Sequence, residues 1–118
     1  KNNFIPIIFT SRKEKIIENN YLQMDFYNSL SSFIAEIVAD MKYEIGYLIS
    51  KGGITSNTIL NSSFNIDYVY LEGQICSGIS LVKAKLTNNK NDLPVITFPG
   101  NLGNDHSLTQ VWQAMENT

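Results

Sequence analysis

Three short, mainly apolar runs dominate the hydrophobic pattern of this chain. They cover residues 4–9 (FIPIIF), 45–50 (IGYLIS) and 93–98 (LPVITF), and polar or glycine residues follow each of them. Runs of this length with few polar positions are typical of strands that are covered on both faces. Pro6 has no N–H group to offer a neighbouring strand, so we expect it near a sheet edge or at the start of its strand.

Two further segments, residues 64–71 and 79–86, alternate between apolar and polar positions, as strands with one solvated face do. No helical pattern separates these two segments, and residues 75–78 are expected to form a tight loop. We therefore expect the two strands to be locally antiparallel or to include an excursion from the main sheet.

A stripe of apolar residues at helical spacing lies between the first two runs. Its members are separated by steps of 3, 1, 3, 1 and 3 residues, which predicts one buried face of a helix that ends near Lys42. Asn28 and Ser29 are the candidate N-caps, residues 13–20 could form a charged surface helix, and residues 21–27 are expected to be irregular. The stripe, which we expect to be core, consists of Leu30, Phe33, Ile34, Ile37, Val38 and Met41.

Helical patterns also follow the second and third apolar runs. A short helix is expected to start within residues 57–60, and an amphipathic helix over residues 107–116. Because strands alternate with helices, the predicted class is α/β, a three-layer α/β/α sandwich around a mostly parallel or mixed sheet. With 118 residues, 43% of them hydrophobic and 17% charged, residues 1–118 are expected to form a single domain.

Charge and cysteine content exclude several classes of partner. The net charge is −2 and no basic cluster is larger than Arg12, Lys13 and Lys15, so we expect neither a nucleic-acid nor a membrane partner. No apolar run is long enough for a membrane span, and no signal peptide is apparent. The single cysteine, Cys76, allows no internal disulfide and fits a reducing, cytoplasmic location.

The candidate chemistry is concentrated in the sequence KGGITS at residues 51–56, between a predicted strand and a predicted helix. Gly52 and Gly53 would let backbone N–H groups approach an anion, the helix N-terminus would add a partial positive charge, and Lys51 a full one. The same sequence is also typical of a plain strand-to-helix turn with Thr55 as the N-cap, because turns with two glycines are common. Both interpretations stay open at this point.

Two other polar loops follow predicted buried strands. One is residues 100–103 (GNLG), and the other is Thr10, Ser11 and Arg12. If the strands are parallel, all three loops lie at one edge of the sheet, and loops with so little side-chain bulk suit a phosphate or a nucleotide. Neither the Walker pattern nor the dinucleotide fingerprint is present.

Single residues near these loops give weaker signals. Asp105 is expected to cap the last helix, or alternatively to lie near phosphates and Mg²⁺. His106 is the only histidine, so no metal site is expected among protein ligands. Cys76 has no histidine near it in sequence, which favours an unreactive thiol, and Arg12 is either a solvated side chain or a phosphate contact.

Taken together in order, the motifs resemble one known family. Thr10-Ser11-Arg12, KGGITS at 51–56, GQICSGISL at 73–81 and FPGNLGNDHSL at 98–108 are similar to the C-terminal nucleotide-binding domain of the four-carbon acid sugar kinases. The sequence departs from the family pattern at Ser77, where proline is usual, and at His106 and Ser107, where small residues are common. By position, the resemblance implies a nucleotide site that contains Ser11, Gly52, Gly53, Thr55, Gly100, Gly103 and Asp105. We add Lys51 for its charge, and Ile54 and Asn101 as residues of the same loops.

The resemblance also implies a function. It implies a domain that binds ATP with Mg²⁺ in enzymes that phosphorylate threonate-like or erythronate-like acid sugars, with the sugar site in a separate N-terminal domain. We therefore expect this chain alone to be catalytically inactive, with ATP as its ligand, an acid sugar reached only through the other domain, and homo-oligomers possible. The alternative is a stand-alone binding module or an inactive remnant.

Overall fold

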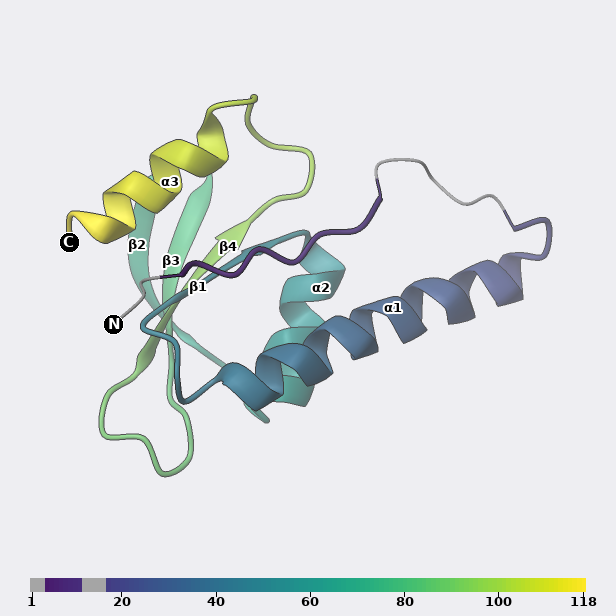
Figure 1. Ribbon diagram of the computed structural model, residues 1–118, viewed down its shortest axis with the longest axis horizontal. Helices are drawn as coiled ribbons and strands as arrows, with labels where there is room; N and C mark the ends of the chain where they lie inside the picture. Colours follow the sequence, from purple (N-terminus) through teal and green to yellow (C-terminus); the bar gives the residue numbers. More distant parts are fainter. Residues whose placement is uncertain (1–3, 12–16) are drawn as a thin grey trace.

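The computed structural model describes residues 4–11 and 17–118, and within them a four-stranded sheet lies between helices (Figure 1). In chain order the elements are α1 (Asn20–Met41), β1 (Leu48–Lys51), α2 (Gly53–Thr58), the π-helical turn η1 (Ile59–Ser63), β2 (Tyr70–Cys76), β3 (Ile79–Ala84), β4 (Leu93–Phe98) and α3 (Ser107–Glu116).

The sheet is mixed, with the strand order β1-β4-β3-β2. β1 runs parallel to β4, with Ile49 opposite Ile96, whereas β3 is antiparallel to both β4 and β2. The predicted strand over residues 64–71 is largely wrong, because β2 starts only at Tyr70 and residues 64–69 form no strand. The antiparallel direction predicted for this pair of strands is confirmed. The turn between the two strands is shorter than expected, because Ile75 and Cys76 still belong to β2 and only Ser77 and Gly78 connect the strands.

The sheet divides the hydrophobic core into two parts. Neighbouring residues of β4 point to opposite faces, so that Val95 and Ile96, both at most 1% exposed, belong to different clusters. On one face, residues of β3 and β4 pack against Ala35 and Val38 of α1 and Ile59 of η1. On the other face, Val111 of α3 covers the sheet. Helices on both faces confirm the predicted α/β sandwich and explain why β4 is an almost uninterrupted apolar run.

Helix α1 begins eight residues earlier than the first predicted N-cap, Asn28. Its N-cap is Asn19, whose side-chain oxygen accepts hydrogen bonds from the backbone N–H groups of Tyr21 (2.9 Å) and Leu22 (3.3 Å). The predictions of Asn28 or Ser29 as caps and of irregular structure over residues 21–27 are therefore wrong, because this cap starts the helix ahead of the apolar stripe.

The predicted stripe on α1 is only partly core. Ala35 and Val38 are the buried residues of this helix, whereas Phe33 is 60% exposed. The remaining stripe residues are half-buried. The helix therefore contacts the rest of the domain along a narrower strip than the apolar pattern predicted, and Phe33 lies outside that strip.

The predicted strand over residues 4–9 is not formed. This segment has no regular structure, and its apolar side chains are exposed, from 47% for Ile8 to 83% for Phe9. Within the described part of the chain, the backbone of residues 4–11 makes no hydrogen bond to the sheet. An apolar run indicates a tendency to be covered, but a strand also needs a partner for its backbone groups. Arg12 and residues 13–16 lie outside the described residues.

Candidate functional site

Two glycine loops meet at one edge of the sheet, where the adjacent parallel strands β1 and β4 end. The backbone N–H of Gly52 donates a 2.8 Å hydrogen bond to the carbonyl of Phe98, the last residue of β4. A Cβ atom added to Gly100 would lie 3.6 Å from the Cα of Gly52, which is ordinary van der Waals contact. The expectation that these two loops come together is therefore confirmed.

The first loop starts helix α2 directly after β1. Gly52 has a φ of +108°, a conformation that residues with a Cβ rarely adopt, and Gly53 is already the first residue of α2. The interpretation of Thr55 as the N-cap is wrong, because the conformation of Gly52 starts the helix earlier and places Thr55 in its first turn. Ile54 is 69% exposed beside it.

Gly53 faces open space. A Cβ atom at this position would have no heavy atom within 4 Å, and its φ is not positive. The first N–H groups of a helix have no acceptor within the helix, so those of Gly53, Ile54 and Thr55 remain as donors at this end of α2. The space in front of the loop is thus bordered by backbone donors rather than by side chains.

A buried pair of serines fastens α2 to β1. The hydroxyl of Ser56 donates to the hydroxyl of Ser50 at 2.8 Å, and both residues are buried. Sequence reasoning overlooked both serines. The available signal was their position, since Ser50 and Ser56 flank the KGGIT segment as small hydroxyl residues.

Lys51 is engaged by the second loop. Its ammonium group donates to the carbonyls of Pro99 (3.2 Å), Gly100 (3.1 Å) and Leu102 (3.3 Å). It also lies 4.2 Å from the centre of the Phe98 ring, within the range of a cation–π interaction. The structure therefore connects Lys51 to backbone carbonyls, which differs from the phosphate contact that the sequence suggested.

Gly103 closes the second loop tightly. It has a φ of +93°, and a Cβ atom there would lie 2.6 Å from Ser107 Oγ, so close that the Ser107 side chain or the loop would have to shift. The side chain of Asn104 accepts a 2.9 Å hydrogen bond from the backbone N–H of His106. The prediction that Asp105 caps α3 is wrong, because Asn104 and Ser107 make the hydrogen bonds at this end, and Asp105 is exposed.

The family model described as nucleotide-binding C-terminal domain matches residues 2–108. The chain belongs to this family. The matched region contains both glycine loops, and the family description gives nucleotide binding as the property of this domain. No curated protein matches the chain.

Two solved structures share the fold of this nucleotide-binding domain. Both are crystal forms of a Bordetella bronchiseptica protein described as a domain of unknown function, with bound citrate, as a domain-swapped dimer. One is 18% identical over 72% of this chain, and the other 16% identical over 87%, each with a TM-score of 0.61. The chain spans only 22% and 24% of the length of those proteins.

A third loop reaches the second glycine loop, but it is not the predicted one. The turn between β2 and β3 does so, since a Cβ atom on Gly78 would lie 3.0 Å from Leu102 Cδ2. Sequence reasoning noted this turn without assigning it to the site. Thr10 and Ser11 are exposed, and no contact described for them joins them to either glycine loop.

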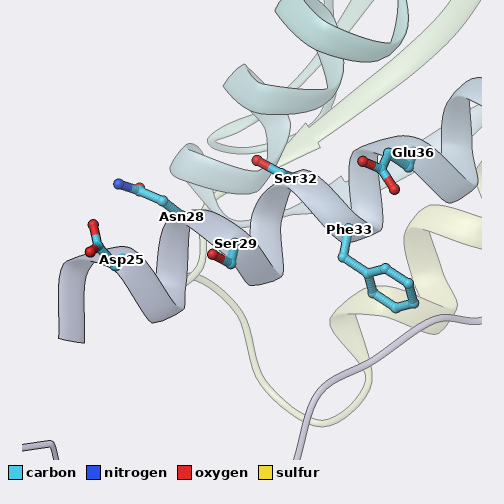
Figure 2. A pocket seen from close by; sticks show the side chains of 6 residues that line it. All are labelled: Asp25, Asn28, Ser29, Ser32, Phe33 and Glu36. Carbon is cyan, nitrogen blue, oxygen red and sulfur yellow. The ribbon is translucent and has the colours of Figure 1, made fainter. Parts of the chain in front are cut away.

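Neither the acidic residues nor a surface depression along α1 offers a competing site. Among residues 4–11 and 17–118, no three His, Cys, Asp or Glu side chains form a group that could hold a metal ion. The depression, about 500 Å³, is lined only by residues of α1, including Asp25, Phe33 and Glu36 (Figure 2). Its side chains spread along the helix surface, and its two carboxylates do not suit a phosphate ligand.

The C-terminal helix is anchored to the residues that precede β1. The hydroxyl of Tyr47 donates a 2.5 Å hydrogen bond to the carboxylate of Glu116. Burial, followed by the hydrogen bond and negative charge of Glu116, raises the pKa of Tyr47 to about 12.

Of the described helices, none combines the length and apolar character that crossing a membrane requires.

Proposed function

We propose that this domain binds ATP between its two glycine loops and forms the nucleotide-binding part of a kinase for four-carbon acid sugars. The observation that carries the proposal is the contact between Gly52 and Gly100 at the end of two adjacent parallel strands. Ligands of α/β sheets bind at the carboxyl ends of the strands, and glycines there let the backbone approach a phosphate closely. The family assignment supports nucleotide binding by this domain.

Backbone groups would hold the phosphates. In the first loop these are the N–H groups of Gly53, Ile54 and Thr55, and in the second loop those of Gly100, Asn101 and Gly103. The phosphates of ATP would occupy the open space in front of Gly53, where an added Cβ atom would meet nothing within 4 Å. The exposed side chain of Ile54 offers an apolar surface next to the same donors.

Magnesium fits this edge only as part of the nucleotide complex. Asp105 is the one carboxylate of the second loop, and a single carboxylate together with phosphate oxygens is a usual coordination for Mg²⁺. When bound, the ion would neutralise charge on the transferred phosphate. The residues of this chain would orient the nucleotide and supply amide donors to it.

The acid sugar would be bound by another part of a longer protein. The similar Bordetella proteins are more than four times the matched length, and they hold citrate, which shares carboxylate and hydroxyl groups with four-carbon acid sugars. Their domain-swapped dimers also motivate a test of self-association for this chain by light scattering. Alone, this chain would position one substrate only, and it would forfeit most of the rate that positioning two substrates provides.

The nucleotide site is tested by replacing Gly53 with valine and titrating Mg-ATP in a calorimeter. Gly53→Val should abolish binding while lowering the melting temperature only slightly, because the added side chain enters open space that the phosphates would occupy. Gly46→Val is the matched control. Gly46 is also exposed, has no positive φ and would have nothing within 4 Å of its Cβ, but it precedes β1 at the opposite end of the strand. Unchanged ATP affinity in Gly53→Val would refute the site.

The second candidate function is a stand-alone nucleotide-binding module without kinase activity. ADP production is measured with Mg-ATP and a panel of four-carbon acid sugars, with and without an added N-terminal domain from a similar kinase. Activity that appears only with the added domain supports the kinase proposal. Nucleotide binding without activity in either mixture supports the module, and turnover by this chain alone would contradict the two-part arrangement.

A further inference from the structure

We propose that Lys51 is a positioning residue, which holds the second glycine loop so that its amide groups face the ligand, and that it is not a phosphate ligand itself. The inference rests on the proposed ATP site and specifies how that site is organised. It starts from the unusual set of partners around the ammonium group, which are carbonyl oxygens of a single loop.

All three donors of the ammonium group have acceptors within the protein. A lysine ammonium carries three N–H donors, and the carbonyls of Pro99, Gly100 and Leu102 lie 3.1 to 3.3 Å from Nζ. The Phe98 ring covers another side at 4.2 Å. A phosphate oxygen could be contacted only after one of these hydrogen bonds had broken.

The carbonyls that Lys51 binds determine where the loop amides point. In a trans peptide bond the C=O of one residue and the N–H of the next point in opposite directions, and the described chain contains no cis peptide bond. Carbonyls of Pro99, Gly100 and Leu102 directed at Lys51 therefore direct the N–H groups of Gly100, Asn101 and Gly103 away from it. These three N–H groups have no acceptor within the described part of the chain.

A lysine suits this role because its donors spread from one point. Three carbonyls around a single nitrogen match the geometry of an ammonium group, whereas the planar guanidinium of arginine distributes its donors over a wide fork. No carboxylate pairs with the Lys51 ammonium group among the described residues, where the ion pair is between Lys83 and Glu72. The carbonyl dipoles are thus the groups that stabilise this cation.

The experiment compares Lys51→Met, which removes the ammonium group, with Lys51→Arg, which keeps the charge but cannot reproduce three carbonyl contacts. Hydrogen exchange is followed at the amides of Leu102 and Asn104, which are hydrogen-bonded within the loop, and ATP affinity is measured by calorimetry. The matched control is Lys42→Met, since Lys42 donates to the carbonyl of Ser63 (3.0 Å) and lies near the ring of Tyr43, outside the glycine loops.

We expect both Lys51 variants to exchange the two loop amides about tenfold faster or more, and to lose ATP affinity by about tenfold. Lys42→Met should change neither quantity. An arginine variant that keeps full ATP affinity while its loop exchanges rapidly would show that charge alone matters, and would overturn the inference. Unchanged exchange in Lys51→Met would also overturn it. If the wild-type protein binds no ATP while Lys51→Met still loosens the loop, the proposed nucleotide site fails and the positioning of the loop by Lys51 stands.

Discussion

The strongest structural test of the second glycine loop is the substitution Gly103→Ala. The φ of +93° at this position costs a residue with a Cβ about 1–3 kcal/mol. The new Cβ atom would also lie 2.7 Å from the Cβ of Ser107, roughly 1 Å inside the favourable carbon–carbon separation. Overpacking of this kind costs typically about 1–3 kcal/mol. Together these effects predict a loss of unfolding free energy on the order of 3 kcal/mol.

The measurement is a urea titration with a thermal melt, in which 1 kcal/mol corresponds to about 4 °C for a domain of this size. Gly100→Ala is the matched control in the same loop, because its Cβ would meet Gly52 at an ordinary 3.6 Å and its φ is not positive. It should cost well under about 1 kcal/mol. Gly103→Ala in a Ser107→Gly background should lose the cost of the Ser107 contact and retain the backbone cost of about 1–3 kcal/mol together with a tight 3.2 Å contact to Phe98 Cζ. Equal stability of Gly103→Ala and Gly100→Ala would refute the reasoning.

Two further predictions concern the packing and the pH dependence of the domain. Phe33→Ala should lower the unfolding free energy by less than about 1 kcal/mol, because Phe33 is 60% exposed. Phe64 is 2% exposed, so Phe64→Ala should cost about 3–5 kcal/mol in the same denaturant titration. Similar losses in the two variants would contradict the difference in burial between Phe33 and Phe64. The raised pKa of Tyr47 means that the folded protein keeps a proton which the unfolded chain releases from about pH 10, so stability should fall as the pH rises from about 10 to about 12. Tyr47→Phe should show a smaller decline over this window, and an identical decline would contradict the raised pKa of Tyr47.

Much of the fold could be predicted because burial on both faces leaves a direct mark on the sequence. β4 and α3 have the predicted bounds, since Val95 and Ile96 must both be apolar and Val111 repeats at helical spacing with its neighbours. The start of α1 could not be predicted this way, because its first turns contact little and only the cap at Asn19 marks them. The apolar segment at residues 4–9 shows the opposite failure, since its composition carries no information about a pairing partner.

The sequence predicted only part of the candidate site, for a similar reason. The glycine positions predicted the two loops, but Gly53 and Gly103 look alike in sequence, although one faces open space and the other is packed against Ser107. The partners of Lys51 lie 48 to 51 residues further along the chain, and local spacing cannot reveal which carbonyls will surround its ammonium group.

The central position of β4 has a consequence for how the protein is made. β4 lies between β1 and β3 in the sheet, although it is the last strand in the sequence. During synthesis, β1 therefore emerges from the ribosome well before β4, the strand with which it pairs in the described sheet. The β2–β3 hairpin also emerges before β4, the strand that pairs with β3. Because long-range pairing of this kind is slow and leaves apolar surface exposed, we expect the nascent chain to be prone to aggregation until residues 93–98 have been translated.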